Sequence, residues 1–224
     1  EKIMKKRIKI ILAVAALAIA AVTIIGFNYY NTYKRDNVVK ETVLLVYKHY
    51  TYDSLMNAIE SSGAIENLKT FRKAAAKREL EKHFEPGRYI LKPGQSNQQI
   101  IRIIANSWQE PMRFTLRSHI RTLGKLSGFM GNNFEADSAE FAKVLLNDSL
   151  IKAMGFTRET FIGMFIPNTY ELYWTESPEN IIKRLHREYN AFWNENRIAK
   201  ANSMKISKNQ VMTLASIINE ETNN

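Results

Sequence analysis

The sequence predicts an α+β protein in three parts: an N-terminal transmembrane helix, a small α+β subdomain and a mostly helical region. Three observations lead to this prediction. The uncharged run Ile10–Phe27 has 18 residues, enough to cross a bilayer. Between residues 42 and 116, short β-branched stretches alternate with helical patterns. After residue 117 almost every pattern is helical.

The basic residues are concentrated at the N-terminus. The chain has a net charge of +10, and residues 1–35 hold seven Lys and Arg residues against a single Glu. Because basic residues before a span favour the cytoplasmic side, we expect residues 1–9 to be a cytoplasmic tail and residues 10–33 the anchor. The remainder would lie outside. This topology explains the excess charge, so nucleic acid is not an expected partner. The absence of cysteine excludes disulfides and thiolate metal sites.

A cleaved signal peptide is the alternative to an anchor. Signal peptides have a shorter apolar core, roughly 7–15 residues, that ends at a small-x-small site. Here the run is longer and continues into "GFNYYNTY", whose aromatic residues suit a membrane interface. We therefore favour an uncleaved anchor.

Residues 34–41 are polar and predict a linker, and residues 42–116 predict one compact α+β subdomain. Ser96 and Gln99 form a capping-box pattern that predicts the start of a helix. The expected strands are Thr42–Tyr47, Arg88–Leu91 and Met112–Leu116, and the other expected helices cover residues 52–63 and 65–83.

The region 117–224 contains amphipathic helical patterns over residues 134–148, 178–200 and 207–222. Ser207 and Gln210 form a second capping-box pattern. Between the first two helices, "FIGMFIPNTYELYW" (residues 161–174) fits neither the helix nor the strand period. We expect this aromatic segment to be a loop that either packs over a core or lines a site.

The last helix ends in two glutamates with different predicted environments. At 100° per residue, Glu221 shares the face of Leu214, Ile217 and Ile218, whereas Glu220 lies on the polar face. A carboxylate on an apolar face loses hydration, and the neutral form is then favoured. Glycosidases produce their general acid in this way. The alternative is an ordinary terminal glutamate in water.

Several motifs resemble those of the endolytic murein transglycosylases, the MltG or YceG-like family. "LASIINEET" resembles its ASI-x-x-x-E-T signature, and "GMFIPNTYELY" resembles its G-x-F-x-P-D-T-Y element, with Asn168 in place of the usual Asp. "FEPGRYILKPGQSNQQII" resembles the stretch that closes the family's LysM-like subdomain. Anchor, subdomain and helical region also follow the family's order. The resemblance implies that residues 42–116 are LysM-like and that residues 117–224 are part of the catalytic domain.

The resemblance also implies an activity and its residues. Glu221 would be the single catalytic acid and base of a lytic transglycosylase that forms 1,6-anhydro ends, with no cofactor. The four histidines, His49, His83, His119 and His186, are scattered and predict no metal site. The candidate sugar-binding residues are Phe165, Asn168, Tyr170, Tyr173 and Trp174. Ordinary packing in a hydrophobic core would explain the four aromatic residues equally well.

The implied partners are peptidoglycan glycan strands, the inner membrane and cell-wall synthesis enzymes such as penicillin-binding proteins. Most of the chain would be periplasmic. Family members continue well beyond Glu221, so the catalytic domain is expected to be incomplete here, and we expect these residues to cleave glycan poorly. A non-catalytic, membrane-anchored protein that binds peptidoglycan is therefore the alternative function.

Overall fold

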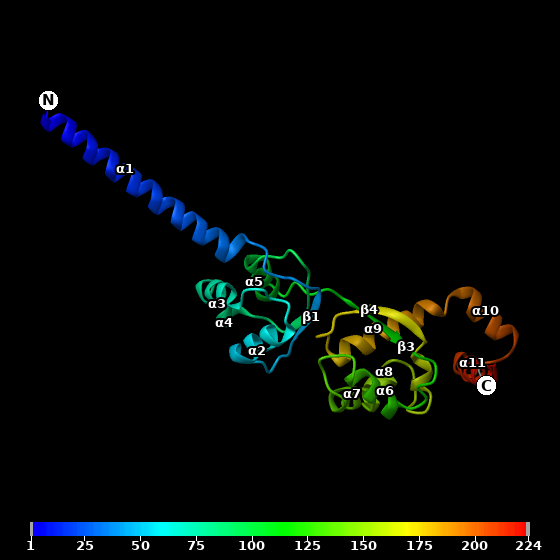
Figure 1. Ribbon diagram of the computed structural model, residues 1–224. Helices are drawn as coiled ribbons and strands as arrows, with labels where there is room; N and C mark the ends of the chain where they lie inside the picture. The colour runs from blue at the N-terminus through cyan, green and yellow to red at the C-terminus, as the bar shows by residue number, and fades with distance from the viewer. Residues whose placement is uncertain (1, 223–224) are drawn as a thin grey trace. The chain divides into compact units, whose positions relative to one another are not determined.

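The computed structural model describes residues 2–222 and has the predicted α+β class (Figure 1). The chain divides into two compact units, Glu1–Glu110 and Pro111–Asn224. Each unit contains a two-stranded antiparallel sheet with helices and its own hydrophobic core. The predicted small subdomain therefore ends near residue 110, not at residue 116.

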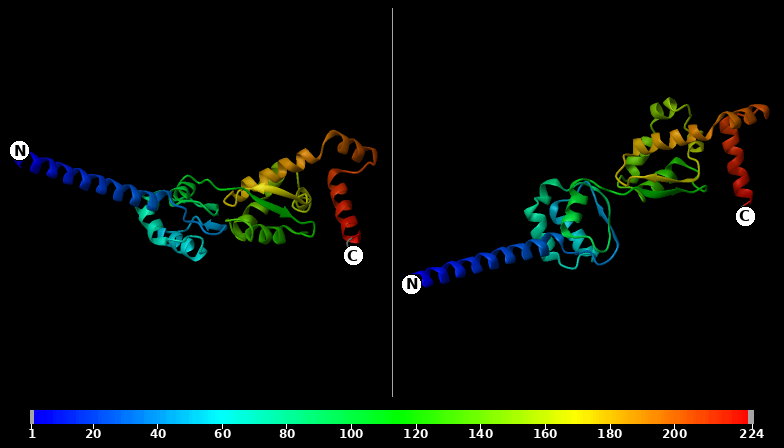
Figure 2. Two further views of the ribbon diagram at one scale, coloured as in Figure 1. Left: turned by 45° about the horizontal axis from the view of Figure 1, so that its top comes forward. Right: turned by 90° about the horizontal axis from the view of Figure 1, so that it is seen from above.

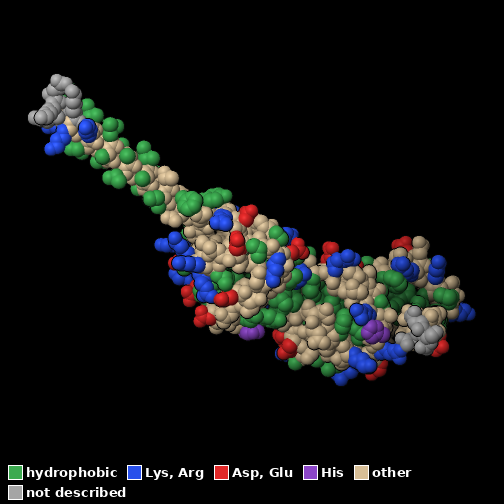
Figure 3. All heavy atoms as spheres, viewed as in Figure 1, with side chains coloured by type: hydrophobic (Ala, Val, Ile, Leu, Met, Phe, Trp, Pro, Cys, Tyr) green, Lys and Arg blue, Asp and Glu red, His purple; other side chains and the backbone are tan. Residues whose placement is uncertain are grey.

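The first helix, α1 (Lys2–Tyr29), is long and apolar enough to cross a membrane. None of the apolar window is buried in the protein, and Figure 3 shows hydrophobic side chains along its visible surface. It continues into a π-helical turn, η1 (Tyr30–Lys34). Because α1 is exposed along its length, a bilayer is the environment that would cover its apolar side chains.

Unit 1 (residues 1–110) is built around the pairing of β1 (Thr42–Val46) with β2 (Gly87–Leu91). The Ser96 N–H donates to Gln99 Oε1 at 2.8 Å, which confirms the predicted capping box. The core of the unit includes Tyr89 and Ile100, both fully buried. The helices of this unit are α2 (Tyr52–Ser62), α3 (Leu68–Lys77), α4 (Leu80–His83) and α5 (Asn97–Ala105).

The prediction of one continuous helix over residues 65–83 is wrong. It is divided into α3 and α4, and Glu79 between them has a left-handed backbone with φ of 51°. A residue other than glycine rarely adopts this conformation, so the sequence contains no signal for the break. The turn places Leu80 in the core, where it is fully buried.

The residues predicted as a linker, 34–41, pack against unit 1 instead. Asn37 and Val38 are each 4% exposed. Asn37 Nδ2 donates to Asn97 Oδ1 at 2.6 Å, and Asn37 Oδ1 accepts from the Asn67 N–H at 2.7 Å. Asn97 Nδ2 in turn donates to the Thr32 carbonyl at 2.9 Å. These bonds join the end of the anchor to α3 and α5.

Unit 2 (residues 111–224) contains a short sheet of β3 (Met112–Leu116) and β4 (Asn168–Leu172). Strand β4 lies inside the aromatic segment that was expected to be a loop, so that prediction is wrong. The helix expected over residues 178–200 is divided by a cap at Asn194. The helices are α6 (Leu123–Gly131), α7 (Ser138–Leu145), α8 (Asp148–Ala153), the 3₁₀ turn η2 (Phe161–Met164), α9 (Pro178–Phe192), α10 (Glu195–Ser203) and α11 (Lys208–Thr222).

The buried asparagine network generates a stability prediction. Asn97→Ala removes one of the hydrogen-bond partners of Asn37 and the side-chain donor to the Thr32 carbonyl, and both groups stay buried. Because a buried polar group without a partner loses its hydration uncompensated, we expect a cost of about 2–4 kcal/mol in the free energy of unfolding. Urea unfolding of the full chain in detergent micelles, followed by circular dichroism, measures this cost.

Asn106→Ala is the matched control, because Asn106 lies at the other end of α5 and its side chain makes one exposed bond, to the Arg102 carbonyl. We expect this change to cost less than about 1 kcal/mol. Equal costs for the two variants would contradict a structural role for the buried network.

Candidate functional site

The candidate site lies in unit 2, where α11 meets one end of the sheet. The capping box predicted at the start of α11 is confirmed. The Ser207 N–H donates to Gln210 Oε1 at 2.8 Å, and the Gln210 N–H donates to Ser207 Oγ at 3.2 Å. Val211 and Met212 then pack against the core of the unit. Figures 1 and 2 show α11, in red, alongside one end of unit 2.

Two sequence motifs meet at this end of the sheet. Asn168, the first residue of β4, pairs with Leu116, the last residue of β3. Ser118 follows Leu116 by two residues, and its Oγ accepts a hydrogen bond from Asn219 Nδ2 at 3.3 Å. The start of the "PNTY" element and the end of "LASIINEET" are therefore held close together by the strand register and by this bond.

The side chain of Glu221 is exposed, and the helix remains regular through Thr222. Glu221 follows Asn219 by two residues, about 200° around the helix axis, so it points away from the contact with Ser118. The side chain of Glu220 lies outside the part of the chain that the structure describes. The structure thus places Glu221 on the face opposite the contact with the sheet end.

The face that carries Glu221 is apolar and exposed. Leu214, Ile217 and Ile218 are 51%, 54% and 53% exposed. The described residues therefore supply no apolar cover for the carboxyl group of Glu221. A neighbouring group that covered these three side chains would also set the environment of Glu221.

Three of the aromatic candidates lie in the core and not on the surface. Phe165, Tyr170 and Trp174 are 7%, 6% and 4% exposed. The Tyr170 hydroxyl donates to the Ile166 carbonyl at 2.6 Å, and burial raises the pKa of Tyr170 to about 12. In this arrangement no sugar ring can stack on these side chains, and their packing holds β4 in place.

Asn168 and Tyr173 remain exposed but lie at opposite ends of β4. Their separation of five residues corresponds to roughly 17 Å along a strand. Tyr173 instead lines a groove of about 350 Å³ between β4 and α9. The basic side chains of this groove include Arg184, which pairs with Glu188 at 2.7 Å, and Lys183, which pairs with Glu179 at 2.7 Å. The structure therefore does not bring Tyr173 to Asn168.

The segment after β3 was not predicted as part of the site. Arg117, Ser118 and His119 are exposed and follow the strand directly, at the sheet end where β4 begins with Asn168. A polar run immediately after a predicted strand was the available signal. Within residues 2–222, no group of three His, Asp or Glu side chains could hold a metal ion.

Comparison with known proteins supports one family. The model of the YceG-like family matches residues 44–224. Among solved structures, a yceG-like protein from Listeria monocytogenes matches with 16% sequence identity and a TM-score of 0.43. That match covers 75% of this chain and 60% of the Listeria chain, so the present chain spans less than two thirds of that protein. Among curated proteins, none matches.

The burial of Tyr170 predicts a pH effect on stability. Its pKa lies at about 12 in the folded protein against 10.0 for an exposed tyrosine. As the pH rises, the Tyr170 hydroxyl therefore loses its proton at a lower pH in the unfolded chain than in the folded protein. The stability from the neutral hydroxyl is present below about pH 10 and is lost as the pH rises towards 12. Tyr170→Phe should reduce this alkaline loss while costing about 1 kcal/mol at neutral pH through the missing hydrogen bond.

The measurement is the free energy of unfolding in urea across this pH range, for the full chain in detergent micelles. Tyr173→Phe is the control, because Tyr173 is 45% exposed. Superimposable pH profiles for the wild type and Tyr170→Phe would show that the hydroxyl is not buried as described.

Proposed function

The chain belongs to the YceG-like family, and we propose that it is a membrane-anchored lytic transglycosylase acting on peptidoglycan. Its substrate would be the glycan strand, cut between N-acetylmuramic acid and N-acetylglucosamine. The observation that carries the proposal is the family match over residues 44–224, which includes Glu221 within the E-T signature.

The geometry of unit 2 supports Glu221 as the reactive group. It follows Ile217 by four residues and Ile218 by three, so the three side chains share one helix face. Within residues 2–222 the apolar side chains of this face are exposed, as those of a substrate-binding face would be. Asn168 and Ser118 lie at the adjoining sheet end, on the other side of α11 from Glu221.

The proposed reaction uses one carboxyl group twice. Protonated Glu221 donates its proton to the glycosidic oxygen as the bond to C1 breaks. The resulting carboxylate then accepts the proton of the muramyl C6 hydroxyl, whose oxygen attacks C1 and closes the 1,6-anhydro ring. Because the nucleophile belongs to the substrate, no water is consumed and no second carboxylate is needed, unlike in ordinary glycosidases.

We also propose an orientation in the membrane. Basic residues precede the apolar stretch of α1, including Lys6, Arg7 and Lys9, and the aromatic residues Tyr29, Tyr30 and Tyr33 follow it. Such a distribution favours a cytoplasmic N-terminus. Both units would then lie in the periplasm, where peptidoglycan and the enzymes that synthesise it, such as penicillin-binding proteins, are available as substrate and partners.

The catalytic assignment predicts different effects for the two glutamates. Glu221→Gln keeps the size of the side chain but cannot transfer a proton, so we expect a loss of about 10²–10⁴-fold in the rate of cleavage. Glu220→Gln should retain most of the activity. The measurement is mass analysis of anhydro-ended fragments released from isolated peptidoglycan.

Both variants should be made in this chain and in a version extended to the length of its family relatives, which we expect to be the more active of the two. Equal losses in the two glutamate variants, or unchanged activity in Glu221→Gln, would contradict the assignment.

The proposed topology is tested separately with reporters fused after Asn224. Alkaline phosphatase, which is active only outside the cytoplasm, should be active in this fusion, whereas a cytoplasmic reporter such as β-galactosidase should be inactive. The reverse pattern would refute the orientation.

A further inference from the structure

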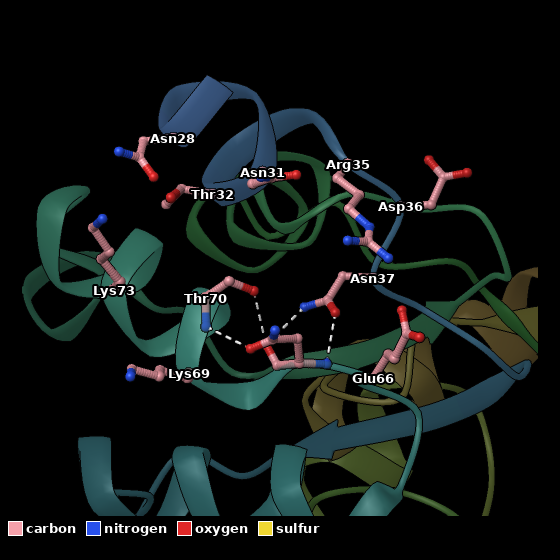
Figure 4. Close-up of a pocket in the computed structure, with 11 residues that line it drawn as sticks. Asn28, Asn31, Thr32, Arg35, Asp36, Asn37, Glu66, Lys69, Thr70 and Lys73 are labelled. Atoms are coloured by element: carbon pink, nitrogen blue, oxygen red, sulfur yellow. Dashed lines mark hydrogen bonds between the residues drawn. The ribbon is translucent and has the colours of Figure 1, made fainter. Parts of the chain in front are cut away.

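A polar pocket of about 430 Å³ lies in unit 1 beside the end of the anchor (Figure 4). One wall comes from the last turns of the anchor, including Asn28 and Thr32, and another from α3, including Lys69 and Lys73. Arg35 also contributes to the lining. The pocket thus lies where the anchor joins the folded part of unit 1, well separated in sequence from Glu221.

The floor of the pocket is rigid because its polar groups bond to one another. Asn67 Oδ1 accepts from the Thr70 N–H at 3.0 Å, and Thr70 Oγ1 donates to the Asn67 carbonyl at 2.9 Å. Asn37 Nδ2 also donates to this carbonyl, at 3.1 Å. A floor with satisfied hydrogen bonds fixes the position of α3 and leaves the cationic side chains as the groups that can bind a ligand.

The cationic side chains of the pocket have no acidic partner. Lys69 and Lys73 are one helical turn apart on α3, and both are exposed. Neither of them, nor Arg35, forms an ion pair with any residue that the structure describes between positions 2 and 222. Because like charges at this spacing repel each other, an anion bound between the two lysines would relieve the repulsion.

The depth of the pocket corresponds to the headgroup layer of a bilayer. The uncharged apolar run ends at Phe27, and Asn28 follows directly. At about 1.5 Å per residue, Thr32 lies roughly 7 Å and Arg35 roughly 12 Å beyond Phe27. A headgroup layer extends about 5–7 Å beyond the hydrocarbon on each side. The wall of the pocket that Asn28 and Thr32 form therefore lies within the headgroup layer, and Arg35 lies roughly 5 Å beyond it.

The two lysines of the pocket lie apart from its carboxylates, and Arg35 lies beside Asp36. Figure 4 shows Lys69 and Lys73 on one side of the pocket, with Asp36 and Glu66 on the other. A phosphodiester would bind on the side of the lysines. The carboxylates would accept hydrogen bonds from the hydroxyl or ammonium group at the outer end of a headgroup.

We propose that this pocket binds the phosphodiester headgroup of a lipid in the surrounding bilayer, with Lys69 and Lys73 as the main phosphate ligands. The inference does not depend on the proposed enzymatic activity, because none of these residues belongs to unit 2.

The test uses the full chain in detergent micelles, titrated with phosphatidylglycerol and observed by native mass spectrometry. The double variant Lys69→Gln/Lys73→Gln should retain roughly tenfold less bound lipid, since each basic residue at a membrane surface contributes measurably to binding an anionic headgroup. The control, Lys77→Gln/Lys125→Gln, removes the same charge from exposed positions outside the pocket and should stay within about twofold of the wild type.

Circular dichroism checks that both double variants are folded. Three results would overturn the proposal. The first is an equal loss of lipid in the two double variants, which indicates unspecific charge attraction. The second is unchanged lipid binding in Lys69→Gln/Lys73→Gln. The third is complete displacement of the lipid by millimolar inorganic phosphate, which indicates a site for the free ion.

Discussion

The hydrogen bonds among Asn37, Asn67 and Asn97 are the constraint on which the arrangement of unit 1 depends. Asn97 is 1% exposed and Asn37 is 4% exposed, so each needs its partners to offset the lost hydration. Those partners come from the end of the anchor, from the turn before α3 and from the start of α5. A single network therefore fixes the membrane-proximal segment, the helix that carries Lys69 and Lys73, and the helix that packs on the sheet.

In unit 2 the corresponding constraint is the pairing of β3 with β4. The paired residues of the two strands are 52 to 60 positions apart in the sequence, and their register decides that Asn168 lies opposite Leu116. A shift by one residue would exchange the buried Tyr170 with a neighbour such as the exposed Glu171, because successive side chains in a strand point to opposite faces. Ser118 follows β3 directly and accepts the bond from Asn219, so α11 meets the sheet at the end that this register defines.

Local signals predicted much of the fold, whereas long-range contacts escaped prediction. The apolar run of α1 and the caps at Ser96 and Ser207 involve neighbouring residues, and each was identified correctly. Asn37 was misjudged as part of a linker because its partners are 30 and 60 positions away. Strand β4 was missed because its pairing with β3 is equally distant. Helical geometry could predict the face of Glu221, but the sequence could not show that the rings of Phe165, Tyr170 and Trp174 would be buried.

The junction between α1 and unit 1 also has a mechanical consequence. The helix continues from α1 into η1 without interruption, Arg78 lies over the Tyr33 ring at 5.5 Å, and Asn97 holds the Thr32 carbonyl. No flexible spacer separates α1 from the rest of unit 1, so a tilt of α1 tilts the whole unit by the same angle. Transmembrane helices tilt when a bilayer becomes thinner than their apolar length. Membrane thickness would thereby become a variable that controls the inclination of unit 1 above the lipid surface.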